Sequence, residues 1–168
     1  MPVDSFKWLP PLLVDQYRAL ELERAAVPWT PLPMPVEKCR FALVTTGGLY
    51  VKGQDAPFDL EREKREPTWG DPTYRIIPRD VKQEDLDAAH LHLNNNDVLL
   101  DINICLPVQR LLEMEQTGEI GSLAPSHYSF MGFQGYPSNT DPWRDRYGPE
   151  VAHRMKEEGV NAALLTPV

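Results

Sequence analysis

Short apolar runs that each end in a turn recur along this chain, with segments of helical periodicity between them. Residues 41–44 (FALV) form one such run, which stops at Thr45-Thr46-Gly47-Gly48, and residues 160–165 (VNAALL) contain the last one. Runs of this kind are typical of strands that are buried on both faces of a parallel sheet. The alternation of apolar runs with helical segments predicts an α/β fold. Its strands are expected to form a Rossmann-like or flavodoxin-like parallel sheet, joined by right-handed crossovers and flanked by helices.

The elements between these two runs follow from the same periodicity argument. They are predicted as strands over residues 74–77 and 127–131, a short helical turn over 82–87, and helices from Pro107 to about residue 116 and over 150–158. Gly118 and Gly159 follow the two helices as stop signals. Residues 52–73 are polar and interrupted by prolines, so most of that segment is predicted to be loop.

The first part of the chain differs in composition from the rest. Residues 5–26 carry apolar positions at helical spacing, whereas residues 27–35 contain four prolines in nine positions. This density of proline is incompatible with a helix or a central strand. The segment is therefore predicted to be an extended arm over the surface, in preference to a ligand for a proline-recognition domain. We predict two parts: an N-terminal helix with a proline-rich arm over residues 1–38, and an α/β domain over residues 39–168.

Charge and composition exclude several classes of protein. The 17 Lys and Arg residues against 25 Asp and Glu residues give a formal net charge of -8, which argues against a protein that coats nucleic acid. No apolar run is long enough to span a membrane, and the N-terminus lacks the pattern of a signal peptide. Cys39 and Cys105 form no CxxC motif, so neither a zinc knuckle nor a disulfide framework is indicated. We expect a cytoplasmic protein without membrane or nucleic-acid partners and without a cofactor.

The two strand exits are candidate binding sites, because ligands of open α/β sheets collect beyond the carboxyl ends of the strands. Thr45-Thr46-Gly47-Gly48 offers two hydroxyl groups and a backbone that an anion can approach closely. The segment matches neither GxGxxG nor a phosphate-binding loop, so a nucleotide site is not indicated. Either it lines a substrate site or it is a plain turn after a core strand. Thr166 stands at the other strand exit.

His90-Leu91-His92 is the sharpest local motif. Residues two apart on an extended segment point to the same side, so both imidazoles can meet one ligand or one metal ion. Asp101 and Asn103 have the same spacing, and two histidines with a carboxylate suit either a divalent metal or acid/base chemistry. The alternative is a polar loop whose histidines cap backbone groups. Without a clear further ligand, we predict no metal site.

His127 and Ser129 share one predicted strand and raise the question of a nucleophile with its base. The chain has no G-x-S-x-G elbow, so a serine hydrolase is not indicated. We expect one of the two to line a pocket while Tyr128 or Phe130 packs inward. Cys105 lies between two apolar residues and is predicted to be a buried apolar side chain rather than a thiolate.

Together these motifs resemble one known family. In chain order they are ALVTTGG (42–48), GDPTYR (70–75) with Pro78, HLH (90–92), DxNxxxPxxRL (101–111), GxIGxxAPxHYSFMG (118–132) and LLTP (164–167). The chain is similar to selenoprotein B of the glycine/sarcosine/betaine reductases and, more closely, to the matching selenoprotein subunit of D-proline reductase. The resemblance runs from about residue 40 to the end, and APxHYSFMG is its most specific part.

The resemblance implies an activity and a partner. Members of the family cleave a carbon–nitrogen bond of a small amino-acid-derived substrate reductively. A selenocysteine or cysteine is the reactive residue, and a partner subunit with a pyruvoyl group holds the amine. A selenol suits this work because it ionises below neutral pH and is a good nucleophile and leaving group, by the logic that governs thiolates.

In the family, the reactive residue directly follows the LLTP strand within a U/C-x-x-C-H-like segment, whereas this sequence ends at Val168. We therefore expect a domain that is incomplete at its C-terminus. Either the reading frame was cut at an in-frame UGA codon, or this is a short family member without the redox centre. The first case predicts a reductase subunit, and the second a redox-dead module for ligand binding or assembly. The codons after Val168 distinguish them.

The resemblance also implies the site residues. Those expected to line the pocket are Thr45, Thr46, Gly47, Gly48, His90, His92, Asp101, Asn103, His127, Ser129 and Thr166. Of these, His90, His92 and His127 are the expected catalytic residues. His90 or His92 is expected to donate a proton to the departing amine, and the two threonines to bind a carboxylate. An open sheet edge further predicts a homo-oligomer.

Overall fold

The structure is a computed structural model that describes residues 6–11, 14–15, 18 and 30–168. The chain divides into two compact units, Met1–Pro31 and Leu32–Val168. The helix predicted over residues 5–26 lies mostly outside the described residues, as does the first part of the proline-rich arm. The domain boundary predicted at residue 38 stays a prediction. In the described part of the chain, no helix is long and apolar enough to cross a membrane.

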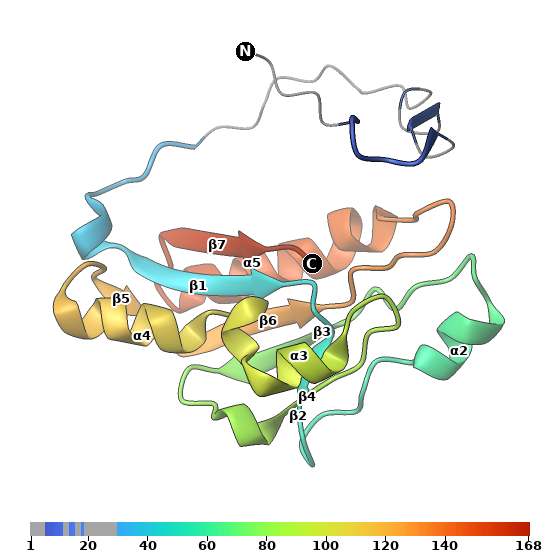
Figure 1. The fold of residues 1–168 in the computed structure, drawn as a ribbon. Helices are drawn as coiled ribbons and strands as arrows, with labels where there is room; N and C mark the ends of the chain where they lie inside the picture. The colour runs from blue at the N-terminus through green and yellow to red at the C-terminus, as the bar shows by residue number, and fades with distance from the viewer. Residues whose placement is uncertain (1–5, 12–13, 16–17, 19–29) are drawn as a thin grey trace. The chain divides into compact units, whose positions relative to one another are not determined.

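A five-stranded sheet forms the centre of the second unit (Figure 1). β1 (Arg40–Thr45) lies in its middle and pairs in parallel with β7 (Ala162–Thr166), and also with β5 (Ser122–Leu123) and β6 (Ser126–Phe130) in succession. β3 (Tyr74–Pro78) pairs with β6 on the outer side in the antiparallel direction. The predicted α/β architecture is thus confirmed, with a sheet that is mostly parallel.

β3 runs against the other strands because of where the chain re-enters the sheet. Parallel strands need a connection that crosses back over the length of the sheet. The first residue of β3, Tyr74, pairs with Phe130 at the end of β6. The segment between β1 and β3 therefore begins and ends at the carboxyl edge of the sheet, and β3 runs from this edge in the opposite direction to β1.

Helices cover both faces of the sheet, because successive strand residues point to opposite sides. Leu43 and Ile77 belong to one core cluster, which includes residues of α3 (Asn95–Leu100) and α4 (Val108–Thr117). Their neighbours Val44 and Ile76 belong to another, which includes residues of the π-helical segment η4 (Trp143–Tyr147) and of α5 (Gly148–Glu157). The core thus has two layers, one on each side of the sheet.

The remaining elements are short, and they precede β1 or connect the larger elements. They are the antiparallel pair β2 (Leu49–Val51) and β4 (Leu86–Ala88), helix α2 (Leu60–Arg65), and the 3-10 turns η1 (Val36–Lys38), η2 (Gln83–Asp85) and η3 (Ile102–Ile104). The predicted strands are confirmed as β1, β3, β6 and β7, and the predicted helices as η2, α4 and α5. α2 is a difference, because it lies within the segment that was predicted to be mostly loop.

Candidate functional site

The carboxyl ends of β1, β6 and β7 meet at one edge of the sheet (Figure 1). Thr45, the last residue of β1, pairs with Ser129 of β6 and with Thr166 of β7. Beyond β7, the Thr46 hydroxyl accepts a hydrogen bond from the Val168 amide (2.9 Å) and lies 3.1 Å from the Val168 carbonyl oxygen, to which it donates. The two strand exits that were predicted as candidate binding sites therefore lie side by side.

Polar groups in the turn after β1 form hydrogen bonds within the protein. The Thr45 hydroxyl donates to the Thr166 carbonyl (3.2 Å) and accepts from the Gly47 amide (3.1 Å). Gly48 has a φ of +65°, and a Cβ there would lie 2.5 Å from the Ala89 carbonyl oxygen, so glycine is required. The substrate-binding role of Thr45, Thr46, Gly47, Gly48 and Thr166 stays a prediction. A ligand at this turn would share or displace these contacts.

His90 lies buried next to this edge, with 4% of its surface exposed. Its Nδ1 accepts a hydrogen bond from the His92 amide (3.1 Å), so the proton of the neutral ring is on Nε2. No described residue accepts a hydrogen bond from Nε2. Burial, with a smaller effect from His92, lowers the pKa of His90 to about 4. His90 is therefore a neutral ring at pH 7, with an unused N–H donor.

His92 differs from the prediction, because it lies in a turn and not on an extended segment. The Asn95 side chain donates to the His90 carbonyl (3.1 Å) and closes this turn. The two imidazole rings are 5.9 Å apart and nearly perpendicular. The His92 ring packs on Phe133 (4.7 Å between centroids), and its Nε2 lies 3.3 Å from Oε1 of Glu63. Among the described residues, no three metal-ligating side chains gather in one place.

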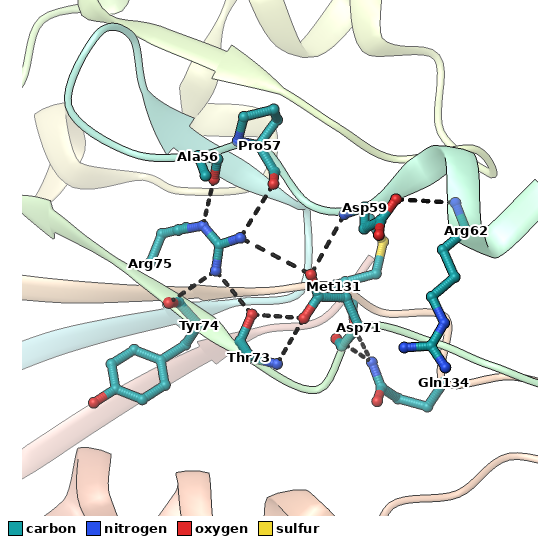
Figure 2. A network of polar contacts seen from close by, with 10 residues as sticks. All are labelled: Ala56, Pro57, Asp59, Arg62, Asp71, Thr73, Tyr74, Arg75, Met131 and Gln134. Carbon is teal, nitrogen blue, oxygen red and sulfur yellow. Dashed lines mark hydrogen bonds and ion pairs between the residues drawn. The ribbon is translucent and has the colours of Figure 1, made fainter.

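Asp71 and Arg75 tie the segment before α2 to the sheet (Figure 2). The buried Asp71 carboxylate accepts hydrogen bonds from the Thr73 amide (3.0 Å) and the Asp59 amide (3.4 Å). The Arg75 guanidinium donates to the carbonyls of Ala56 (2.7 Å) and Pro57 (3.2 Å). On the other side, the buried Gln134 side chain donates to the carbonyls of Asp71 (2.9 Å) and Met131 (2.8 Å). This network links α2 to β3 and to the segment after β6.

Asp101 and Asn103 form a local cap at the start of η3. The Asp101 carboxylate accepts hydrogen bonds from the side-chain amide (2.8 Å) and the backbone amide (3.0 Å) of Asn103, and these bonds lower the pKa of Asp101. The Asn103 side chain also donates to Gln109 (2.9 Å). Within the described residues, the side-chain hydrogen bonds of this pair stay between residues 101 and 109. Its role in substrate binding stays a prediction.

His127 and Ser129 lie inside the sheet and are fully buried. At the break between β5 and β6, Nδ1 of His127 accepts a hydrogen bond from the Leu43 amide (3.2 Å), in place of a backbone carbonyl. Burial, with the charge of Arg79, lowers the pKa of His127 to about 4. Ser129 accepts a hydrogen bond from the Leu49 amide (2.8 Å). Both side chains thus bind backbone amides, and their site roles stay predictions.

Cys105 lies closer to the site than its sequence context indicated. A Cβ built on Gly47 would lie 3.0 Å from its sulfur, and its carbonyl accepts a hydrogen bond from the Thr166 hydroxyl (2.6 Å). The thiol is fully buried, and burial raises the pKa of Cys105 to about 11. The side chain is therefore a neutral thiol at pH 7, as predicted.

Gly132 is a site residue that motif analysis did not single out. A Cβ there would lie 2.9 Å from the Val168 carbonyl oxygen, 3.2 Å from Nε2 of His90 and 3.3 Å from the Thr46 carbonyl oxygen. The missing side chain therefore leaves these three groups close together. Glu63 was also missed, because it stands in a polar segment without an apolar pattern.

A Gly132→Ala substitution is expected to displace His90 or Val168, because the added methyl group is too close to both. Overpacking of this kind costs about 1–3 kcal/mol of folding free energy. Denaturant titration and the imidazole signals of His90 in an NMR spectrum measure the two effects. Unchanged stability together with unchanged His90 signals would contradict the described packing.

Comparison with known proteins shows which family this chain belongs to. A family model described as glycine/sarcosine/betaine reductase selenoprotein B matches residues 21–168. The chain belongs to the selenoprotein B family. The family resemblance inferred from the motifs is thereby confirmed.

Curated relatives are named as reductase subunits. The chain is similar to the D-proline reductase subunit gamma of Acetoanaerobium sticklandii, with 36% identity over 82% of this chain and 52% of the relative. It is 29% identical to the glycine reductase complex component B subunit gamma of Carboxydothermus hydrogenoformans, over 83% of this chain and 30% of the relative. It is 27% identical to the sarcosine reductase complex component B subunit beta of Peptoclostridium acidaminophilum, over 83% of this chain and 30% of the relative.

The chain therefore spans about half the length of the first relative, and less than a third of the other two. No solved structure gives a significant match. By their names, these relatives are subunits or components of reductases.

Proposed function

We propose that this chain provides part of the active site of a selenoprotein B-type reductase, which cleaves a carbon–nitrogen bond of an amino-acid-derived substrate. In this reaction a dithiol supplies two electrons and two protons. The C–N bond is replaced by a C–H and an N–H bond, and the dithiol becomes a disulfide. The observation that carries the proposal is the convergence of His90, Gly132 and Val168 at the carboxyl edge of β1, β6 and β7. Membership of the family supports it.

The two histidines suit different tasks in this reaction. His90 is neutral and buried, so its Nε2–H is suited to donating a hydrogen bond to a group that becomes negatively charged. His92 has 55% of its side chain exposed, so it can exchange protons with solvent. We therefore assign the protonation of the departing amine to His92 and polarisation at the strand edge to His90. In the family the nucleophile follows the β7 strand, and Val168 lies beside Gly132.

Partners and location form part of the same proposal. A partner subunit with a pyruvoyl group would hold the amine, in keeping with relatives that are subunits of complexes. Within the described residues β7 pairs only with β1, and Leu165 on it is 66% exposed, which supports an oligomer through this edge. Thiol and selenol chemistry needs a reducing compartment, which supports the cytoplasm.

A redox-dead module for ligand binding or assembly is the second candidate. The hydrogen bonds that fill the turn after β1 favour it, because they leave few free donors for a substrate carboxylate. Such a module would bind an amino-acid-like ligand or a partner chain without turnover.

The experiment that separates the two candidates uses the protein isolated from its native host, with the subunits that accompany it. D-proline, glycine and sarcosine, the compounds in the relatives' names, are each incubated with the protein and a dithiol. The reductase proposal predicts cleavage of at least one of them, at a rate that depends on both protein and dithiol. Binding without cleavage, measured by calorimetry, would support the module and contradict the reductase.

A further inference from the structure

Glu63 is a buried carboxylate that the fold leaves without ordinary partners. It is the one buried residue of α2, and its side chain is 2% exposed. Neither of its oxygens accepts a hydrogen bond of good geometry from the described residues. Burying a carboxylate without hydrogen bonds costs several kcal/mol by order of magnitude, and such groups call for a specific explanation.

His92 is the group that faces this carboxylate, with Nε2 3.3 Å from Oε1 of Glu63. The ring packs on Phe133, which restricts its orientation. More than half of the His92 side chain is exposed, so the pair joins a buried carboxylate to a ring that reaches solvent. On the other side, His90 accepts a hydrogen bond from the His92 backbone. The pair is therefore attached to the site at the strand edge.

The surroundings of Glu63 favour its protonated form. Burial is the largest effect that raises the pKa of Glu63, and the nearby charge of Asp71 raises it further. The charge and hydrogen-bonding capacity of His92 act in the opposite direction. Asp71 accepts a hydrogen bond from the Thr73 amide and lies 3.9 Å from the Arg75 guanidinium (Figure 2), whereas the ionisable side chain that faces Glu63 is His92. The proton affinity of Glu63 thus depends on the state of His92.

We propose that Glu63 and His92 form a proton-exchanging pair, in which the buried carboxyl group supplies a proton to the imidazole as the imidazole protonates the substrate amine. The Glu63 carboxyl group gives its proton to Nε2 of His92, while Nδ1–H of His92 gives its proton to the amine nitrogen. Glu63 is left as a carboxylate beside Nε2–H, and solvent returns one proton to the pair. Glu63 acts through His92 and is therefore a positioning residue. This inference rests on the proposed function.

The chain contains a matched pair that lacks the buried environment. His153 and Glu157 on α5 lie 3.2 Å apart, but their side chains are 74% and 64% exposed. Solvent screens such a pair, and its interaction energy is small. Substitution of His153 therefore controls for the loss of a histidine near a glutamate, without affecting the site.

The test that needs no enzyme activity follows the Glu63 carboxyl carbon by NMR as pH changes. Wild-type Glu63 is expected to titrate above the ordinary range of glutamate. In His92→Gln its midpoint is expected to rise further, because the imidazole that opposes the effect of burial is gone. His153→Gln is expected to leave the Glu63 curve unchanged. An identical Glu63 midpoint in wild type and His92→Gln, or one at or below the ordinary range, would overturn the pair.

A measurement on the wild-type protein keeps the test independent of how well the variant folds. Protonation of one member of a contacting pair changes the surroundings of the other. The ring-nitrogen signals of His92 are therefore expected to change over the pH range in which the Glu63 carboxyl carbon titrates, because the two side chains are in contact. His92 ring signals that do not respond to the protonation of Glu63 would overturn the proposal.

The activity arm uses the assembled reductase. Glu63→Gln is expected to lower kcat on the order of tenfold to a hundredfold and to change its pH profile, with KM unchanged. His153→Gln is expected to have wild-type kcat. Wild-type kcat and pH profile in Glu63→Gln would overturn the role of the pair. If the wild-type assembly cleaves no substrate, the proposed function fails, and the NMR measurements alone decide the pair.

Discussion

A His90→Ala variant of the assembled reductase is expected to cleave its substrate about 10²–10⁴-fold more slowly than wild type. The substitution removes the buried Nε2–H at the edge of β1, β6 and β7, which has no hydrogen-bond partner among the described residues. Initial rates of carbon–nitrogen bond cleavage, at saturating substrate and dithiol, measure the effect. The loss is expected in kcat, because the donor acts on charge that develops during the reaction.

A His90→Asn variant separates the role of Nε2–H as a hydrogen-bond donor from the role of Nδ1 as acceptor for the His92 amide. The asparagine side-chain oxygen can replace Nδ1 as acceptor for the His92 amide, but it provides no group at the position of Nε2. We therefore expect His90→Asn to fold well and to be nearly as slow as His90→Ala. A wild-type rate in His90→Asn would mean that the only role of His90 is to stabilise the turn through the hydrogen bond from the His92 amide.

Replacement of His127 is expected to lower the stability of the fold. In His127→Leu the buried Leu43 amide loses its acceptor, which costs about 1–3 kcal/mol. His127→Asn keeps an acceptor atom close to the position of Nδ1, so its loss is expected to be smaller. Urea titration at pH 7.5 measures both variants. Equal stability of His127→Leu and wild type would contradict the hydrogen bond between the ring and β1.

The two buried histidines also predict how stability depends on pH. Each has a pKa near 4 in the folded chain, against an ordinary value of 6.5. The contribution of the two neutral rings to the free energy of unfolding is therefore fully present above about pH 6.5. It is lost as pH falls towards 4, because the unfolded chain binds protons at a higher pH than the folded chain does. The shift corresponds to roughly 3 kcal/mol for each ring. His127→Asn is expected to lose less stability than wild type between pH 7 and pH 4.5. Parallel stability curves for the two proteins would contradict the buried, neutral ring.

The elements that the sequence predicted are those with local signals. Apolar runs identify β1 and β7, and prolines and glycines bound α4 and α5. The direction of β3 could not be predicted, because it depends on which edge of the sheet the chain re-enters. α2 was missed for a different reason: it has a single buried residue, and that residue is Glu63, so no apolar stripe marks it.

The candidate site was predictable where its residues follow strands. Thr45, Thr46 and Thr166 lie at the carboxyl edge because they end β1 and β7, and His90 lies beside them. Residue type alone could not show that His127 and Ser129 bind backbone amides, since their partners are far away in the sequence. The contact of Glu63 with His92 depends likewise on tertiary packing. In both His90 and His127, Nδ1 accepts a hydrogen bond from a backbone amide and Nε2 has no partner among the described residues, and the sequence shows neither feature.

The most direct measurement of the central claim is the stoichiometry of the reaction in the assembled protein. For each carbon–nitrogen bond cleaved, one dithiol is expected to be oxidised to a disulfide. The cleavage product and the disulfide are expected to disappear together in His90→Ala and to persist in His153→Gln. Dithiol oxidation without cleavage of the carbon–nitrogen bond, or full turnover in His90→Ala, would show that the edge formed by β1, β6 and β7 is not where the substrate is reduced.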